Sequence, residues 1–409
     1  MHRFLIFSFL ILSILSLIFG FLFNEDLSSG GAEYDFNIAI KNLSNFTIAN
    51  LSEYTRHFPL HYILLSIPYN LFNDNLILRV VYLIFSSLFP IFLFLNLNYI
   101  FSSNKTNALL ITASILFLPF FRSSSMWANA HLTAAIFFLI SNFFYLKGLK
   151  ENEIYKYLNL FFLSLATYSL QTYVVFYIFY LIYYYNNLVF KDFINLFIFC
   201  IFLSIPGFIF ILFSAGERSI YGLSFSKNIS FSLISNFSII FFYYCFFIFN
   251  KKNFTQLKNS FIETKKLKLF FLISFFLLNI YFYGKDDSYL MLGGGFFYKL
   301  SFILIQNNLI FFLSSFLGLL ISLLIVNKEP KFLYIIIIIN VMSSHYLVYQ
   351  KYFEPIFFVM IFVLFKNFLT ENIISSKKNT LIFISLILGY YSITLLNSFT
   401  GISKSLIIS

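Results

Sequence analysis

Acidic residues are scarce in this chain of 409 residues, where 16 Asp and Glu stand against 27 Lys and Arg. Charged residues make up only 11% of the chain, compared with about 25% in soluble domains. The hydrophobic share is 60% and the mean hydropathy is +0.86. This composition excludes an ordinary soluble domain and indicates a membrane protein.

Cysteine is nearly absent too. Cys200 and Cys245 both fall in stretches predicted to be helical, and neither belongs to a CxxC or a Cys/His pattern, so no disulfide framework or zinc site is indicated. A loop carboxylate can hold a divalent metal, but no second ligand stands at a diagnostic spacing, and no cofactor is assigned. The net charge of +11 fits the positive-inside rule and attraction to membrane lipids, so no nucleic-acid partner is predicted.

Long apolar runs are abundant. A membrane-spanning helix needs about 20 apolar residues, and residues 4–23 supply them directly. Because irregular backbone cannot face lipid, the chain is predicted to be an all-α polytopic membrane protein. Thirteen helices are expected, over residues 4–23, 76–100, 107–121, 126–146, 157–169, 171–186, 192–213, 229–249, 269–283, 304–326, 332–349, 352–366 and 379–398.

Residues 58–72 form a shorter apolar stretch. Fifteen residues in a helix reach about 22 Å, short of a hydrocarbon core of about 30 Å, which predicts a juxtamembrane helix. A spanning helix here is the rival topology. With the N-terminus inside, most Lys and Arg fall in the cytoplasm, which places 24–57 and 285–299 outside and 251–268 inside.

The first outer loop concentrates acid, because residues 24–57 hold five of the 16 carboxylates. A glycine turn at Gly30 and Gly31 precedes Glu33 and Asp35, and a short helix is expected to start near Glu33. A carboxylate at a membrane edge can take a proton from an attacking hydroxyl or amine. The alternative is that these loop acids are merely solvated.

Cations follow at the start of the juxtamembrane helix. Arg56, His57 and His61 flank Pro59, at a depth where side chains meet lipid headgroups. Arg binds phosphate in a bidentate manner, so a lipid-phosphate site is one interpretation and interfacial anchoring is the other. His57 is interpreted as a hydrogen-bonding neighbour, because no second metal ligand is suitably spaced.

Three later outer segments also carry a cation. Arg122 lies in a polar turn predicted over 121–131, and Lys299 follows the glycines at 293–295 in a predicted loop. Lys351 precedes Glu354 in the last polar cluster. Each has a structural alternative, namely a serine-rich turn, a flexible glycine turn and an interfacial pair.

The order of these features resembles the GT-C fold of membrane glycosyltransferases, which includes protein O-mannosyltransferases and the aminoarabinose transferases of lipid A. Tyr34-Asp35-Phe36 resembles the first-loop acid motif, and residues 57–62, His-Phe-Pro-Leu-His-Tyr, resemble the Pro-Leu-Tyr helix. Arg79 then opens the second spanning helix. The match covers residues 1–230, with the first outer loop at 24–75, and leaves 231–409 as a variable C-terminal membrane module.

The resemblance implies an enzyme that moves a sugar from a polyprenyl-phosphate donor to a lipid, glycan or protein acceptor at the outer, periplasmic face of a bacterial inner membrane. No carboxylate lies between Arg122 and His131, which leaves Asp35 as the principal base, with Glu33 as its companion. The implied substrate-binding residues are Arg56, His57, His61, Arg122, Lys299 and Lys351. An O-antigen polymerase, a flippase for lipid-linked oligosaccharides and a non-catalytic scaffold are the alternatives.

Overall fold

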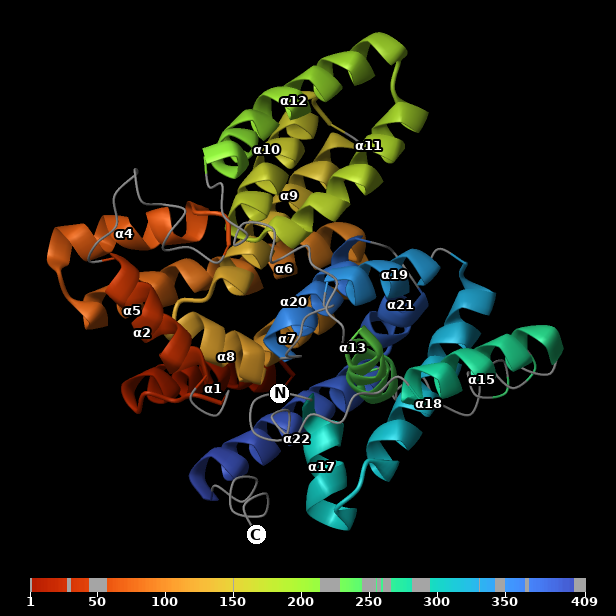
Figure 1. The fold of residues 1–409 in the computed structure, drawn as a ribbon. Helices are drawn as coiled ribbons and strands as arrows, with labels where there is room; N and C mark the ends of the chain where they lie inside the picture. The colour runs from red at the N-terminus through yellow and green to blue at the C-terminus, as the bar shows by residue number, and fades with distance from the viewer. Residues whose placement is uncertain are drawn as a thin grey trace. The chain divides into compact units, whose positions relative to one another are not determined.

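The computed structural model describes residues 2–27, 31–43, 57–149, 151–213, 229–244, 255, 259, 266–281, 295–330, 332–342, 350–364 and 368–400. Every regular element within these ranges is helical (Figure 1). The chain forms two compact units, residues 1–224 and 225–409. Whether a family module ends at residue 230 stays a prediction.

The first unit holds the helices α1 (His2–Leu22), α2 (Gly31–Leu43), α4 (Leu60–Phe72), α5 (Asn75–Ser86), α6 (Leu88–Ile100), η2 (Ser102–Asn104), α7 (Lys105–Ser114), η3 (Ile115–Phe117), α8 (Pro119–Met126), α9 (Ala130–Gly148), α10 (Ile154–Ser169), η4 (Gln171–Val174), α11 (Val175–Asn187) and α12 (Phe190–Phe213).

The second unit holds α13 (Ile229–Asn236), the π-helix η6 (Phe237–Tyr243), α15 (Lys266–Tyr281), α17 (Gly295–Ile305), α18 (Leu309–Lys328), α19 (Phe332–Met342), α20 (Gln350–Val359), the π-helix η8 (Met360–Leu364), α21 (Phe368–Ser375) and α22 (Lys377–Thr400).

Six stretches of helix among the described residues are long and apolar enough to cross a membrane, and the pair 102–117 and 119–126, bent by 62°, is a seventh if it counts as one span. Several are exposed along most of their length, as helices that face lipid are. The chain is therefore an all-α protein of the membrane. The full count of thirteen stays a prediction.

Most of the stretch 58–72 forms α4, a helix of 13 residues that is too short to count among the candidate spans, and its juxtamembrane position stays a prediction. Asp74 then caps α5, with its carboxylate 2.6 Å from the Leu76 amide and 3.2 Å from the Ile77 amide. The residue Asn73 between the two helices adopts a left-handed conformation with φ of 48°. This short connection turns the chain from α4 into the next span.

The structure corrects three sequence-based boundaries. The predicted turn 121–131 is mostly the helix α8, which starts where Pro119 forces Leu118 into an extended conformation. The predicted loop around Lys299 is the helix α17. The predicted helix 304–326 is broken at 306–308, where the Asn307 side chain accepts a hydrogen bond from the Leu309 amide, the first of α18, at 2.8 Å.

A polar network in the first unit ties α6, α9, α10 and α11 together. The Asn142 amide donates to the Asn96 side chain at 3.1 Å, and the Tyr180 hydroxyl donates to Asn142 at 3.1 Å. Asn159 of α10 bonds to the backbone carbonyl of Ser141 at 3.0 Å and accepts from Tyr184 at 3.0 Å. Hydrogen bonds of this kind join helices inside a membrane.

Candidate functional site

The acidic helix α2 starts with a carboxylate cap supplied from the preceding loop. Asp26 accepts hydrogen bonds from the amides of Ala32 at 3.0 Å and Glu33 at 2.9 Å. These amides have no partner within the helix, so the cap fixes its first turn. Glu33 is exposed and Asp35 is half-buried. The helix expected near Glu33 is therefore present, and both acids lie near its N-terminus.

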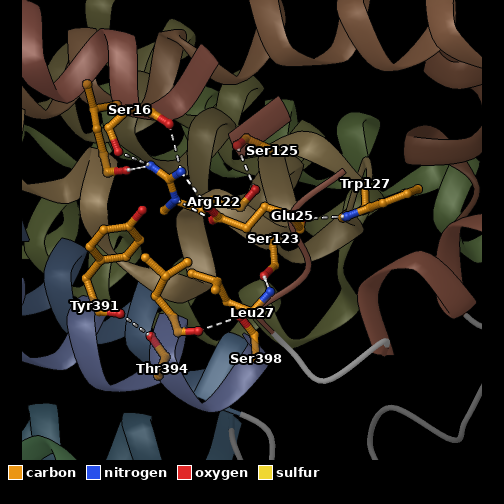
Figure 2. Close-up of polar contacts among 12 residues, drawn as sticks. Ser16, Glu25, Leu27, Arg122, Ser123, Ser125, Trp127, Tyr391, Thr394 and Ser398 are labelled. Atoms are coloured by element: carbon orange, nitrogen blue, oxygen red, sulfur yellow. Dashed lines mark hydrogen bonds and ion pairs between the residues drawn. The ribbon is translucent and has the colours of Figure 1, made fainter. Parts of the chain in front are cut away.

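An arginine clamp holds the loop ahead of α2. It is made of Arg122, Glu25 and Ser16 (Figure 2), together with the Leu116 carbonyl. Arg122 is fully buried in α8 and binds Glu25 through two parallel bonds, at 2.5 Å from Nε and 2.8 Å from Nη2. Its remaining N–H groups donate to Ser16 and Leu116 at 2.8–3.3 Å. Because a guanidinium has five N–H donors, all are used within the protein.

Two further bonds fasten the same loop to α8. The Trp127 indole donates to the Glu25 carbonyl at 2.9 Å, and the Leu27 amide donates to the Ser123 hydroxyl at 3.1 Å (Figure 2). Asp26, which caps α2, lies between these two anchored residues. The position of α2 and its acids is thus set by contacts with a helix about 100 residues further along the chain.

Gly20 makes room for the clamp. A Cβ atom at this position would collide with Nη2 of Arg122 and lie 2.8–2.9 Å from Met126 and the Glu25 carboxylate. Any larger residue would displace the ion pair from the surface of α1. The glycine near the end of α1 is therefore a packing requirement of the clamp.

Arg79, one turn into α5, is a second buried arginine with very different partners. Arg79 is only 7% exposed to solvent. Nε donates to the Met126 carbonyl at 2.9 Å, and Nη1 donates to the Asn24 side chain at 2.7 Å. The guanidinium lies over the Trp127 ring, with Cζ 3.8 Å from the ring centroid. Nη2 is buried and has no hydrogen-bond partner among the described residues.

No carboxylate forms an ion pair with Arg79 in the described part of the chain. Glu33 is close enough to interact with it electrostatically. Phe36 of α2 meets the Trp127 ring edge-on, with centroids 5.8 Å apart. Trp127 therefore joins the acidic helix to the Arg79 guanidinium, and Asp35 immediately precedes the residue that makes this contact.

Three histidines lie beside this group. His61 is buried, with Nδ1 2.9 Å from the Thr133 hydroxyl, and the rings of His57 and His131 are 5.7 Å apart. The pKa of His61 is lowered to about 3, mainly by burial and secondly by nearby His57, while a hydrogen bond with the Ala128 backbone acts in the opposite direction. His61 is therefore neutral at physiological pH.

Phe58 anchors the entrance to α4. Its ring packs edge-on against Tyr168 of α10 at 5.9 Å and Phe210 of α12 at 5.5 Å. The Tyr168 hydroxyl donates to the Leu203 carbonyl and accepts from the Gly207 amide at 3.2 Å, next to a proline in α12. This contact fixes where His57 and His61 enter the site.

The sequence-predicted residues separate into distinct groups. Glu33 and Asp35 lie on α2, which contacts α4, where His61 lies. His57 comes just before α4, and Arg122 binds Glu25 in the loop before α2. Lys299 belongs to α17 of the second unit, and the Lys351 side chain and all of Arg56 lie outside the described residues.

Sequence reasoning missed the roles of Glu25 and Trp127, and it used Arg79 only as a landmark. One signal was present, because an arginine inside an apolar spanning segment is rare and usually functional. Glu25 gave no comparable signal, since its partner is 97 residues away.

Comparison with protein-family models, curated proteins and solved structures found no match for this chain. Among the described residues, no three His, Cys, Asp or Glu side chains gather as metal ligands would. The functional argument therefore rests on the residues of this chain alone.

Proposed function

We propose that this chain is a membrane glycosyltransferase of the GT-C type, with about thirteen spanning helices and its site at the outer face of the membrane. It would take a sugar from a polyprenyl-phosphate donor and pass it to a lipid, glycan or protein acceptor. One observation carries the proposal. The acidic helix α2 and a buried arginine with no ion pair among the described residues meet at Trp127.

Asp35 supplies the base in this proposal. The acceptor hydroxyl or amine attacks the anomeric carbon of the donor sugar, and its proton passes to the Asp35 carboxylate. The bond between the anomeric carbon and the phosphate oxygen breaks, and the lipid phosphate leaves with the electron pair. Asp35 is half-buried, which suits a base that must reach both solvent and substrate.

Arg79 is the cation best suited to the lipid phosphate. A phosphate oxygen can accept from Nη2, which is the donor that the described residues leave unused. The negative charge would also compensate a buried guanidinium that costs free energy when it is unpaired. Arg122 is less suited, because Glu25, Ser16 and Leu116 already take its donors. Arg56 stays a candidate from the sequence.

The test is a transfer assay on membranes supplied with labelled polyprenyl-phosphate sugars. Asp35→Asn is expected to reduce the rate by about 10²–10⁴-fold, the usual loss for a general base, while donor binding persists. Glu33→Gln is the companion variant, because the two acids are close in sequence. Asp192→Asn, in the first turn of α12, is the control and should keep the wild-type rate.

Wild-type turnover in both Asp35→Asn and Glu33→Gln would contradict the assignment of α2 as the catalytic helix. Extension of a lipid-linked glycan by whole repeat units would instead favour the polymerase. Movement of a lipid-linked glycan across the membrane, without transfer of a sugar, would favour the flippase.

A further inference from the structure

The last helix, α22, has two different faces. Phe383, Ile387 and Tyr390 are buried against the second unit. Leu381 is 53% exposed and Ile382 is 38% exposed, on the opposite side. A helix with one apolar face in the core and another facing outward is expected of a span at the edge of a bundle. The outward face of α22 is therefore available to lipid.

A groove of about 610 Å³ runs along this outward face. Among the described residues it is lined by Lys377, Lys378, Leu381, Ile382, Ser385 and Leu386. Both lysines are exposed, and they stand together at the N-terminal end of the groove. The residues that follow are mainly apolar. The groove thus has a cationic end and a hydrocarbon-like body.

The dimensions of the groove match one leaflet of a bilayer. Lys378 and Leu386 are eight residues apart, which corresponds to about 12 Å along a helix. This is less than half of a hydrocarbon core about 30 Å thick. The lysines would then lie at headgroup depth while Leu381 and Leu386 lie at the depth of the acyl chain.

We infer that this face of α22 binds a phospholipid with an anionic headgroup, held at its phosphate by Lys377 and Lys378 and along its acyl chain by Leu381, Ile382 and Leu386. The charge of the groove selects the lipid. Two adjacent lysines attract an anionic headgroup more strongly than a zwitterionic one, and basic pockets on the cytoplasmic side of membrane proteins bind such lipids. The positive-inside rule predicts this end of α22 to be cytoplasmic.

This site is separate from the proposed transfer reaction. It belongs to the second unit, whereas the acids and Arg79 belong to the first. Its lipid would be a fixed partner of the fold and not a donor or an acceptor. Its existence therefore does not depend on the glycosyltransferase proposal.

The test is native mass spectrometry of the full chain in detergent, with dioleoyl phosphatidylglycerol and dioleoyl phosphatidylcholine as probes. The two lipids share their acyl chains and differ only in the headgroup, which is anionic in the first and zwitterionic in the second. The wild-type protein should retain phosphatidylglycerol preferentially. The double variant Lys377→Gln/Lys378→Gln should weaken phosphatidylglycerol binding about tenfold or more and abolish the preference.

Lys156→Gln is the matched control. Lys156 lies near the start of α10, at an end also predicted to be cytoplasmic, and its ammonium is 3.5 Å from the Glu153 carboxylate. This variant should keep the wild-type preference. Equal retention of both lipids by the wild-type protein, or an unchanged preference in the double variant, would overturn the inference. Both substituted lysines are exposed, so the double variant is expected to fold.

Discussion

Arg122 of α8 and Arg79 of α5, which donates to the last carbonyl of α8, are both buried, yet their surroundings differ. Arg122 is matched by a carboxylate and uses all five donors within the protein. Arg79 has a carbonyl, an amide oxygen and an aromatic ring as neighbours, and one of its nitrogens is unused among the described residues. The hydrogen-bonding groups of Arg122 are all satisfied by the protein, whereas a bound anion could accept a further hydrogen bond from Arg79.

The difference follows from the cost of burying charge. A buried ion pair offsets the lost hydration of both groups, while a buried charge without a counter-ion does not. A protein keeps the second arrangement only if another benefit outweighs its cost, and binding of an anionic ligand is such a benefit. In this account Arg122 therefore has a structural role, and Arg79 has a ligand-binding role.

The largest expected effect on stability comes from breaking the clamp. Arg122→Met should lower the free energy of unfolding by about 3–5 kcal/mol, because Glu25 is left largely buried without its cation. Arg79→Met should be neutral or stabilising, because it removes a buried charge that has no ion pair in the part of the chain that the structure describes. Thermal unfolding of the purified protein in detergent measures both changes.

A companion variant sharpens this prediction. Glu25→Gln combined with Arg122→Met should recover part of the loss, since the remaining buried carboxylate is neutralised. If Arg79→Met destabilises the protein as much as Arg122→Met does, the distinction between the two arginines is wrong.

A smaller effect is expected from filling the space at Gly20. Gly20→Ala should cost about 1–3 kcal/mol, because the added carbon meets the clamp and the packing around it must shift. Gly389→Ala in α22 is the matched control. Nothing lies within 4 Å of a Cβ there, and alanine favours a helix, so this change should stabilise slightly. Equal responses at the two glycines would show that the clamp tolerates displacement.

The pH dependence of stability should show a still smaller effect, from His61. Its pKa is lowered from 6.5 to about 3, mainly by burial, so between these values the unfolded chain binds a proton that the native protein does not. Stability must then fall as the pH drops below about 6.5, by roughly 1 kcal/mol per pH unit. His61→Gln should flatten this part of the curve of melting temperature against pH. A wild-type melting temperature that stays constant from pH 7 to 5 would contradict a neutral, buried His61.

The sequence predicted the parts of this fold that depend on local pattern. The apolar run 4–23 corresponds to α1, the shorter apolar stretch 58–72 to α4, and the acids after the glycine turn to the start of α2. In each case the signal lies in hydrophobic length, a proline or a turn residue within a few positions. Such signals need no knowledge of distant partners.

The parts that depend on distant partners could not be predicted. Arg122 looked like a residue of an outer turn because its carboxylate, Glu25, lies 97 positions earlier. Lys299 looked like a loop residue because three preceding glycines outweighed the apolar run that forms α17. Which cation forms a structural ion pair depends on carboxylates from distant parts of the chain. No local sequence pattern identifies such a pair.

Trp127 offers the most direct measurement of the account's central claim, that Arg79 binds a lipid phosphate. It is the only Trp in the chain, and the Arg79 guanidinium lies 3.8 Å from its ring, so its fluorescence reports on this site. Titration of the purified protein with geranyl phosphate should change Trp127 emission saturably, whereas geraniol should not. Arg79→Gln should raise the Kd about tenfold or more, the loss expected for a charge-assisted hydrogen bond, and Asp35→Asn should leave it unchanged. The same saturable response to geraniol, or an unchanged Kd in Arg79→Gln, would contradict the account.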